Sequence, residues 1–226
     1  MDRDLAGIIA IERLHSPGSL PIATQSGFLC PPAGKTIFSK LDLVRGNHQI
    51  PVTPEDVPKT AIITSFGLYE FLQMPFGLKD AGQSFQRFMD TVLRDIPCSF
   101  HYLDDILVAS SSEEEHLDDL RVVCSRLHEQ GLVVHMEKCV FGAESIEFLG
   151  HTISRHGARP LPAKVEAITN FPRPTTIKGL QQFLGMLNFY HRFLQGAAQN
   201  LHPMYSAQGE EYLRLDSKKN HCFRQW

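Results

Sequence analysis

The sequence of 226 residues contains no apolar run near the ~20 residues that a membrane-spanning helix needs. Its short apolar stretch at residues 7–11 follows two aspartates, which makes it a poor secretory signal. Cysteine is scarce, and its five residues are odd in number, widely scattered and without a CxxC pair. These absences exclude a disulfide framework and a zinc motif. They predict an intracellular protein, cytoplasmic or nuclear, with reduced thiols and no membrane partner.

The composition is that of a globular protein, with 42% hydrophobic and 21% charged residues. The length suits one large domain or a domain with a smaller satellite. Charge is unevenly divided, because residues 1–150 hold 12 Lys and Arg against 21 Asp and Glu, whereas residues 151–226 hold 10 against 4. The basic C-terminal third is therefore the part that we expect to hold a polyanion.

Composition and hydrophobic periodicity divide the chain into four segments. Residues 1–36 contain eight Gly or Pro and no clear period, so we expect irregular structure there. Residues 37–150 carry strand and helix patterns in turn. Residues 151–205 combine prolines and basic residues with helical patterns, and residues 206–226 form a polar tail.

Short apolar runs predict strands or extended segments at 37–43, 61–71, 99–103, 106–109, 132–135, 139–141 and 146–149. Two hairpins are expected among them. The first joins the third and fourth runs and has Asp104 and Asp105 at its tip. The second joins the last two runs through a Gly-containing loop at residues 142–145.

Helices are predicted where apolar residues recur at helical spacing. One begins at Ala81 and carries an aromatic-rich apolar face over four turns. Another begins at Ser112, which forms a capping-box pattern with Glu115, and ends at Gly131. Two more are expected at residues 163–169 and after a cap at Thr175 or Thr176.

Three aspartates are the candidate catalytic residues. Asp42 ends the first strand, and Asp104 and Asp105 are flanked by apolar residues, where adjacent carboxylates normally need a cation. If the first strand lies beside the hairpin, the three carboxylates meet at one sheet edge and can hold two Mg²⁺ ions for in-line phosphoryl transfer. A bare Asp-Asp pair is a weak motif. Asp118 and Asp119 form another on a predicted exposed helix, and we assign them no role.

Several motifs resemble the reverse transcriptase of gypsy-type (metavirus) LTR retrotransposon Pol polyproteins. They are FSKLDL at 38–43, MPFGL at 74–78, FHYLDDIL at 100–107, FLGH at 148–151, FPRPT at 171–175 and FLGMLNFY at 183–190. The resemblance covers about residues 37–205 in the family's order and spacing. It implies an α+β fold in which residues 37–150 form a polymerase palm with partial fingers. The antiparallel sheet of the palm is backed by helices, and residues 151–205 form a helical thumb.

By this resemblance, the chain is an RNA-directed DNA polymerase. The resemblance implies that the chain extends a primer with dNTPs on an RNA or DNA template, using two Mg²⁺ ions or Mn²⁺, as part of a Pol polyprotein. The resemblance places the catalytic and metal-binding residues at Asp42, the backbone of Leu43, Asp104 and Asp105. It places nucleotide binding at Asn47, Pro75, Phe76 and Gly77. It places primer binding at Tyr102, Phe148, Leu149, Gly150 and His151.

Departures from the family leave a second function open. Residues 1–36 do not resemble the segment that precedes the first aspartate in the family, so we expect truncated fingers, and we expect no ribonuclease H domain. Asn47 stands where the family has an aromatic residue that excludes a 2′-hydroxyl, and Asp80 stands where the family usually has Asn. The alternative is a catalytically inactive, retrotransposon-derived remnant that at most binds nucleic acid.

Overall fold

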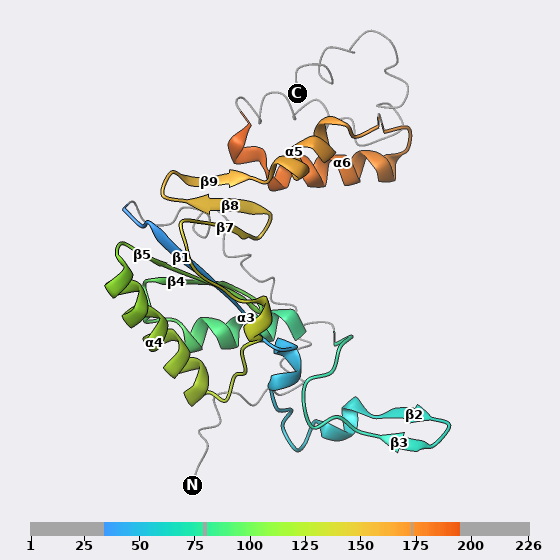
Figure 1. Cartoon of the computed structure of the whole chain (residues 1–226). Helices are drawn as coiled ribbons and strands as arrows, with labels where there is room; N and C mark the ends of the chain where they lie inside the picture. The colour runs from blue at the N-terminus through green and yellow to red at the C-terminus, as the bar shows by residue number, and fades with distance from the viewer. Residues whose placement is uncertain (1–33, 79–80, 173, 195–226) are drawn as a thin grey trace. The chain divides into compact units, whose positions relative to one another are not determined.

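The structure, a computed structural model, describes residues 34–78, 81–172 and 174–194 (Figure 1). Most of the expected irregular segment at 1–36, the polar tail at 206–226 and Asp80 lie outside the described residues. The chain divides into two compact units, the first of residues 1–148 and 153–158 and the second of residues 149–152 and 159–226. In the part of the chain that is described, no helix is both long and apolar enough to cross a membrane.

A four-stranded antiparallel sheet forms the centre of the first unit. Its strands lie in the order β4-β5-β1-β6 and comprise β1 (Ile37–Asp42), β4 (Ser99–Tyr102), β5 (Asp105–Ser110) and β6 (Val140–Ala143). β1 pairs with β5 along its whole length, from Ile37 opposite Ser110 to Asp42 opposite Asp105. β4 pairs with β5 through a tight turn that contains Asp104. The predicted first strand and first hairpin are confirmed.

Successive side chains of β1 point to opposite faces of this sheet. Ser39 and Leu41 point to one face, and Lys40 and Asp42 point to the other. Two helices, α3 (Ala81–Val92) and α4 (Glu113–Glu129), cover the first of these faces (Figure 1). The core between them contains side chains at most 1% exposed, namely Leu41, Phe85, Met89, Ile106, Val108, Val123 and Leu127. The α+β fold, an antiparallel sheet backed by helices, is therefore confirmed.

α4 begins and ends where its sequence signals predict. The Ser112 hydroxyl accepts a hydrogen bond from the Glu115 N–H at 3.3 Å, and Gly131 adopts a φ of 71° just beyond the helix. The Glu115 carboxylate pairs with Lys35 at 2.7 Å and accepts a hydrogen bond from the Ser111 N–H at 2.9 Å. These two partners, Lys35 first, lower the pKa of Glu115 to about 2. The first turn of α4 is thus anchored to the segment before β1.

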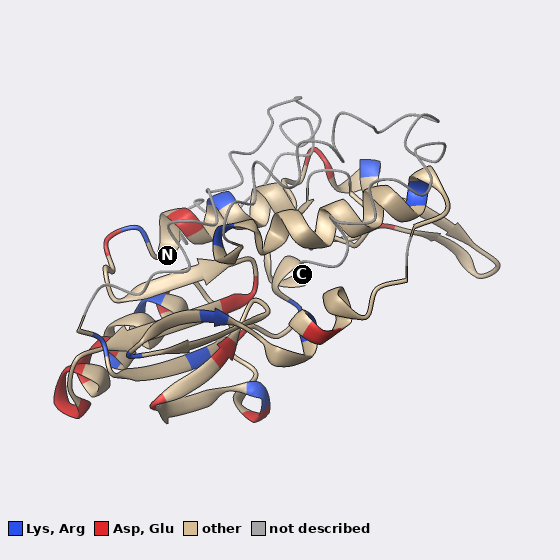
Figure 2. Ribbon diagram, turned by 90° about the horizontal axis from the view of Figure 1, so that it is seen from above, with Lys and Arg blue, Asp and Glu red and all other residues tan. Residues whose placement is uncertain are grey.

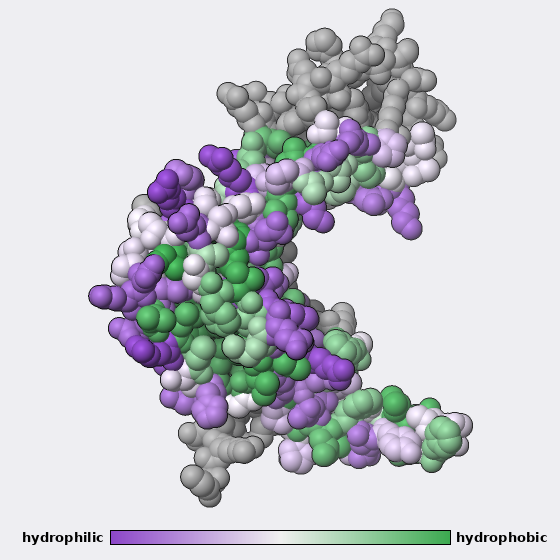
Figure 3. Space-filling model, viewed as in Figure 1, coloured by the Kyte–Doolittle hydropathy of each residue, from purple (hydrophilic) through white to green (hydrophobic). Residues whose placement is uncertain are grey.

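A small two-stranded ribbon lies between β1 and α3. It consists of β2 (Ile62–Thr64) and β3 (Gly67–Tyr69), and single turns of 3₁₀ helix at Gly46–Gln49 and Val57–Thr60 precede it. Ile63 and Phe66 on the ribbon are each 88% exposed, so apolar side chains lie at its surface (Figure 3). The extended region predicted at 61–71 is confirmed, and it contributes little to the core.

The second predicted hairpin is wrong. β6 pairs with β1. The next strand, β7 (Ser145–Phe148), belongs to a three-stranded sheet with β8 (His151–Ser154) and β9 (Gly157–Pro160), in the order β7-β8-β9. Only Glu144 separates β6 from β7, which is too short a connection for a hairpin turn. The strand predicted at 132–135 is also wrong, since it is reduced to a single bridge between Val134 and Leu43.

The second unit contains α5 (Pro162–Thr169) and α6 (Ile177–Phe189), which confirm the two helices predicted there. The Thr176 hydroxyl caps α6 by accepting a hydrogen bond from the Gly179 N–H at 3.1 Å. The buried face of α6 comprises Leu180, Phe183, Leu184 and Leu187. The partly buried ring of Phe171 packs against this face, so the unit has a small core of its own.

Candidate active site

The strand register brings two of the three candidate aspartates side by side. Asp42 is the last residue of β1 and Asp105 the first of β5, and they are direct cross-strand partners. Side chains at such positions share one face of the sheet, with Cβ atoms about 4.5–5.5 Å apart. The Asp104 carbonyl accepts a hydrogen bond from the Leu43 N–H at 3.1 Å. Asp42, Leu43, Asp104 and Asp105 therefore meet at one end of the sheet.

Polar side chains of α3 hold the turn that carries the acids. The Leu103 N–H donates to the Gln86 side-chain oxygen at 2.8 Å, and Leu103 adopts a φ of 53°. The Gln86 amide donates to Asp90 Oδ1 at 2.9 Å, and His101 Nε2 lies 2.9 Å from the same oxygen. Gln86 and Asp90 are not among the predicted site residues, because the hydrophobic period of this helix indicates only an apolar face. Their spacing of four residues was the available signal.

Lysine side chains pair with both of the opposed aspartates. Lys40 Nζ lies 2.8 Å from Asp105 Oδ1, and Lys138 Nζ lies 3.5 Å from Asp42 Oδ1. Basic and acidic residues accordingly lie next to each other on this sheet (Figure 2). Within residues 34–78, 81–172 and 174–194, no three His, Cys, Asp or Glu side chains gather closely enough to hold a metal ion. The two ion pairs neutralise the carboxylates of Asp42 and Asp105 in this structure.

The opposed carboxylates fit a divalent cation in donor chemistry, although among the described residues no third His, Cys, Asp or Glu side chain joins them closely enough to complete a protein site. Mg²⁺ prefers oxygen ligands and uses few protein carboxylates beside substrate phosphates. Asp42 and Asp105 supply such oxygens from adjacent strand ends, with side chains 17% and 27% exposed, and Asp104 is exposed in the turn between them.

A cavity of about 120 Å³ lies beside Asp104. Asn47, Phe76 and Asp104 line it, so two of the four predicted nucleotide-binding residues come together with one of the acids. The other two, Pro75 and Gly77, are not among its lining residues. Gly77 adopts a φ of 92°, which a residue with a side chain rarely tolerates. Pro75 and Gly77 therefore shape the segment that presents Phe76.

The predicted primer-binding residues of the first unit differ in exposure. Tyr102 ends β4 opposite Asp105 and is 41% exposed, so its ring is available to a ligand at the acids. Phe148, at the end of β7, is 1% exposed and is a core residue.

The remaining predicted primer-binding residues form a tight turn in the second unit. Leu149 and Gly150 have φ angles of 45° and 76°, as a two-residue type I′ turn requires. The Tyr190 hydroxyl donates to the Gly150 carbonyl at 3.1 Å, and His151 Nδ1 lies 2.8 Å from the Leu149 carbonyl oxygen. His151 is fully buried beside the rings of Phe189, Tyr190 and Phe193, and burial lowers its pKa. The ring of His151 supports the turn from inside.

A buried polar network lies near the start of β1. His116 Nε2 and Nδ1 lie 2.7 and 2.8 Å from the hydroxyls of Ser39 and Ser110, and the Ser110 hydroxyl donates to Asp119 at 2.6 Å. Burial lowers the pKa of His116. Burial, followed by a hydrogen bond to Asp119, raises the pKa of the Cys98 thiol to about 12. Asp119, to which sequence analysis assigned no role, is the acceptor that ends this network.

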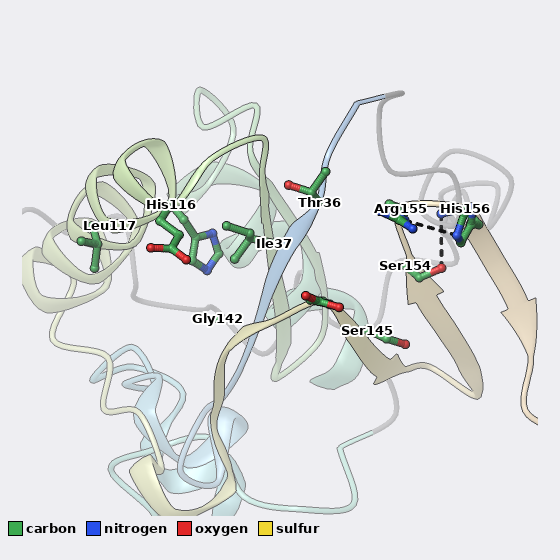
Figure 4. Close-up of a pocket in the computed structure, with 11 residues that line it drawn as sticks. Thr36, Ile37, His116, Leu117, Gly142, Ser145, Ser154, Arg155 and His156 are labelled. Atoms are coloured by element: carbon green, nitrogen blue, oxygen red, sulfur yellow. Dashed lines mark hydrogen bonds between the residues drawn. The ribbon is translucent and has the colours of Figure 1, made fainter.

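His116 also borders a cavity of about 700 Å³ together with Thr36 and Ile37 (Figure 4). Ile37 begins β1 and Asp42 ends it. At about 3.4 Å per residue, the strand separates the two by roughly 17 Å. This cavity is therefore distinct from the acid site.

Solved structures of a viral polymerase share this fold. The chain matches the foamy viral protease-reverse transcriptase in complex with double-stranded DNA at a TM-score of 0.73 and 27% identity, over 80% of this chain and 32% of that one. The match to that protein in complex with an RNA/DNA hybrid has a TM-score of 0.68 and 26% identity, over 83% and 27%. The fold is therefore that of polymerases with a reverse-transcriptase palm.

The chain belongs to the reverse transcriptase (RNA-dependent DNA polymerase) family, whose model matches residues 3–153. The match includes most of residues 1–36, so the expectation that this segment does not resemble the family is wrong. The Pol polyprotein of the transposon opus from Drosophila melanogaster is 36% identical over 94% of this chain and 22% of its own length. The Tf2-3 polyprotein of Schizosaccharomyces pombe is 34% identical over 86% and 15%. The chain thus spans about a fifth of the length of such relatives.

Proposed function

We propose that this chain is the RNA-directed DNA polymerase domain of a gypsy-type LTR retrotransposon Pol polyprotein, and that it extends a primer 3′-hydroxyl with dNTPs. The observation that carries the proposal is the pairing of Asp42 with Asp105, with Asp104 in the adjoining turn. Support for a template-primer partner comes from the foamy viral relative, which was solved with double-stranded DNA and with an RNA/DNA hybrid.

Asp42, Asp104, Asp105 and the backbone of Leu43 would hold two Mg²⁺ ions, with Mn²⁺ as a substitute. Such ions lower the pKa of an attacking hydroxyl and stabilise a leaving phosphate oxygen. The protein's own contribution is positioning, which supplies much of the catalysis of phosphoryl transfer. Here that positioning comes from the β1–β5 register and from the hold of Gln86 on the turn.

Asn47 and Phe76 would contact the incoming nucleotide, because both line the cavity beside Asp104. An asparagine amide is smaller than the aromatic ring expected at this position, so we propose weakened exclusion of a 2′-hydroxyl. Tyr102 would contact the primer terminus, since its exposed ring lies opposite Asp105. The turn at Leu149 and Gly150 would present backbone to the primer, with the hydrogen bond from the His151 ring to the Leu149 carbonyl supporting it.

The second candidate is a catalytically inactive remnant that binds nucleic acid. Two observations favour it, the asparagine at position 47 and the lysine partners of Asp42 and Asp105. Binding would then depend on the basic residues beyond residue 150 and weaken steeply with salt.

A primer-extension assay on an RNA template separates the two candidates. The test variant is Asp105→Asn, and the matched control is Asp118→Asn, because Asp118 is 74% exposed and pairs with Arg121 outside the site. The polymerase proposal expects incorporation by the parent and by Asp118→Asn and none by Asp105→Asn. Salt-sensitive binding by the parent, without any extension, would establish the remnant instead.

A further inference from the structure

We propose that Lys40 and Lys138 are positioning residues that occupy the cation positions at Asp105 and Asp42 in the metal-free protein. By competing for these carboxylates, the two lysines set the affinity of the site for divalent metal. This inference rests on the proposed function, because it requires Asp42 and Asp105 to be metal ligands.

The need for a positive charge follows from the strand register. Asp42 and Asp105 are direct partners on one face of the sheet, and like charges placed directly opposite each other destabilise a strand pair. Both side chains are largely shielded from water, at 17% and 27% exposure, which strengthens their repulsion. Without a cation between them, the repulsion of the two carboxylates would weaken the pairing of β1 and β5 at this end.

Lys40, a residue of β1, supplies a positive charge at Asp105. It lies two residues before Asp42, so its side chain is on the same face, and it is diagonal to Asp105 across the strand pair. Its ammonium lies 2.8 Å from Asp105 Oδ1, and its side chain is 25% exposed. The short distance and the partial burial make this the firmer of the two ion pairs.

Lys138 approaches from a separate segment that is fastened to Asp42 itself. The His135 N–H donates to the Asp42 carbonyl at 2.7 Å, and the Lys138 N–H closes a short turn on the His135 carbonyl at 3.0 Å. The Lys138 ammonium lies 3.5 Å from Asp42 Oδ1 on a side chain that is 61% exposed. This pair is longer and more hydrated, so Asp42 is expected to exchange its lysine for a metal ion more readily than Asp105 does.

The test measures metal binding in the absence of nucleic acid and dNTP. Free Mn²⁺ is followed by electron paramagnetic resonance for the parent, Lys40→Met and Lys138→Met. The matched control is Lys35→Met, since Lys35 is 18% exposed and forms an ion pair of 2.7 Å with Glu115 away from the acids. A second readout is the melting temperature in EDTA and with added Mg²⁺.

Lys40→Met is expected to bind Mn²⁺ about two- to fivefold tighter than the parent, the range that loss of a partly exposed ion pair supports. It should also melt at a lower temperature in EDTA and gain more from Mg²⁺. Lys138→Met should show a smaller shift in Kd. Lys35→Met should lower the melting temperature while leaving the Mn²⁺ Kd unchanged. Lys40→Gln, which keeps a hydrogen-bond donor near Asp105, replaces the Met variant if that variant does not fold.

Two further measurements separate failure of this inference from failure of the proposed function. The first outcome is that the parent binds Mn²⁺ and Asp105→Asn does not, which supports the metal site. If Lys40→Met then has the same Kd for Mn²⁺ as Lys35→Met, the lysine inference is overturned. If Asp105→Asn binds Mn²⁺ as tightly as the parent, the assigned metal site is wrong and the lysine inference falls with it. If the double variant Lys40→Met with Asp105→Asn loses the tighter Mn²⁺ binding of Lys40→Met, both the metal site and the lysine inference are supported.

Discussion

Replacing Gly46 with alanine should destabilise the first unit, because the added methyl group has no room. A Cβ at Gly46 would lie 2.6 Å from Phe85 Cζ and 3.1 Å from both Cε atoms of that ring. Phe85 is 1% exposed in the core beneath the sheet, so its ring has little space in which to move. Overpacking of this kind costs about 1–3 kcal/mol. At roughly 2–4 °C per kcal/mol, the melting temperature should fall by about 2–12 °C.

Urea unfolding gives the change in free energy, and hydrogen exchange of the α3 amides assigns the transition to the first unit. Gly185→Ala is the control, because Gly185 is exposed in α6 and has no atom within 4 Å of an added Cβ. That change should stabilise its helix by about 0.5–1 kcal/mol. Combining Gly46→Ala with Phe85→Leu should cost less than the sum of the single changes. An unchanged urea midpoint for Gly46→Ala would show that the Phe85 ring relaxes without cost.

Three other outcomes are expected. Stability should be full above pH 6.5 and decline below it, because burial lowers the pKa of His116 and His151 from 6.5 and the unfolded chain then binds more protons. A melting temperature that does not fall between pH 7.5 and pH 5.5 would contradict this sign. Gly150→Ala should destabilise the second unit by about 1–3 kcal/mol, because the φ of Gly150 is 76° and a Cβ would lie 3.0 Å from the Tyr190 hydroxyl. A urea unfolding midpoint equal to that of the parent would contradict this prediction. Asn47→Tyr should raise the preference for dNTP over rNTP in primer extension, and an unchanged ratio would remove Asn47 from the sugar contact.

Much of the local structure could be predicted from short stretches of the chain. Ser112 and Gly131 mark the ends of α4 because capping depends on groups within a few residues of each other. The apolar period from Ala81 predicts α3, and the two runs around Asp104 predict the β4–β5 hairpin. In each case, the groups that form hydrogen bonds with the backbone are close to it in sequence.

The predictions were wrong or missing for strand, hydrogen-bond and ion-pair partners that are distant in sequence. The run at 139–141 reads locally as half of a hairpin, yet β6 pairs with the edge of β1 because one residue is too short a turn and that edge is open. Asp119 looks like one more acid on an exposed helix, but the fold places it against the Ser110 hydroxyl. Nothing near Lys138 in the sequence indicates that it pairs with Asp42.

Motifs in the chain identify the residues that can do chemistry here: oxygen-bearing acids at the end of one strand and at the tip of one hairpin, in patterns that resemble a reverse transcriptase. That Asp42 lies opposite Asp105, and that lysines neutralise both, becomes visible in the folded protein. A strand's neighbours, and the charges on its face, depend on which edges and surfaces the rest of the chain leaves open. Short-range preferences do not contain that information.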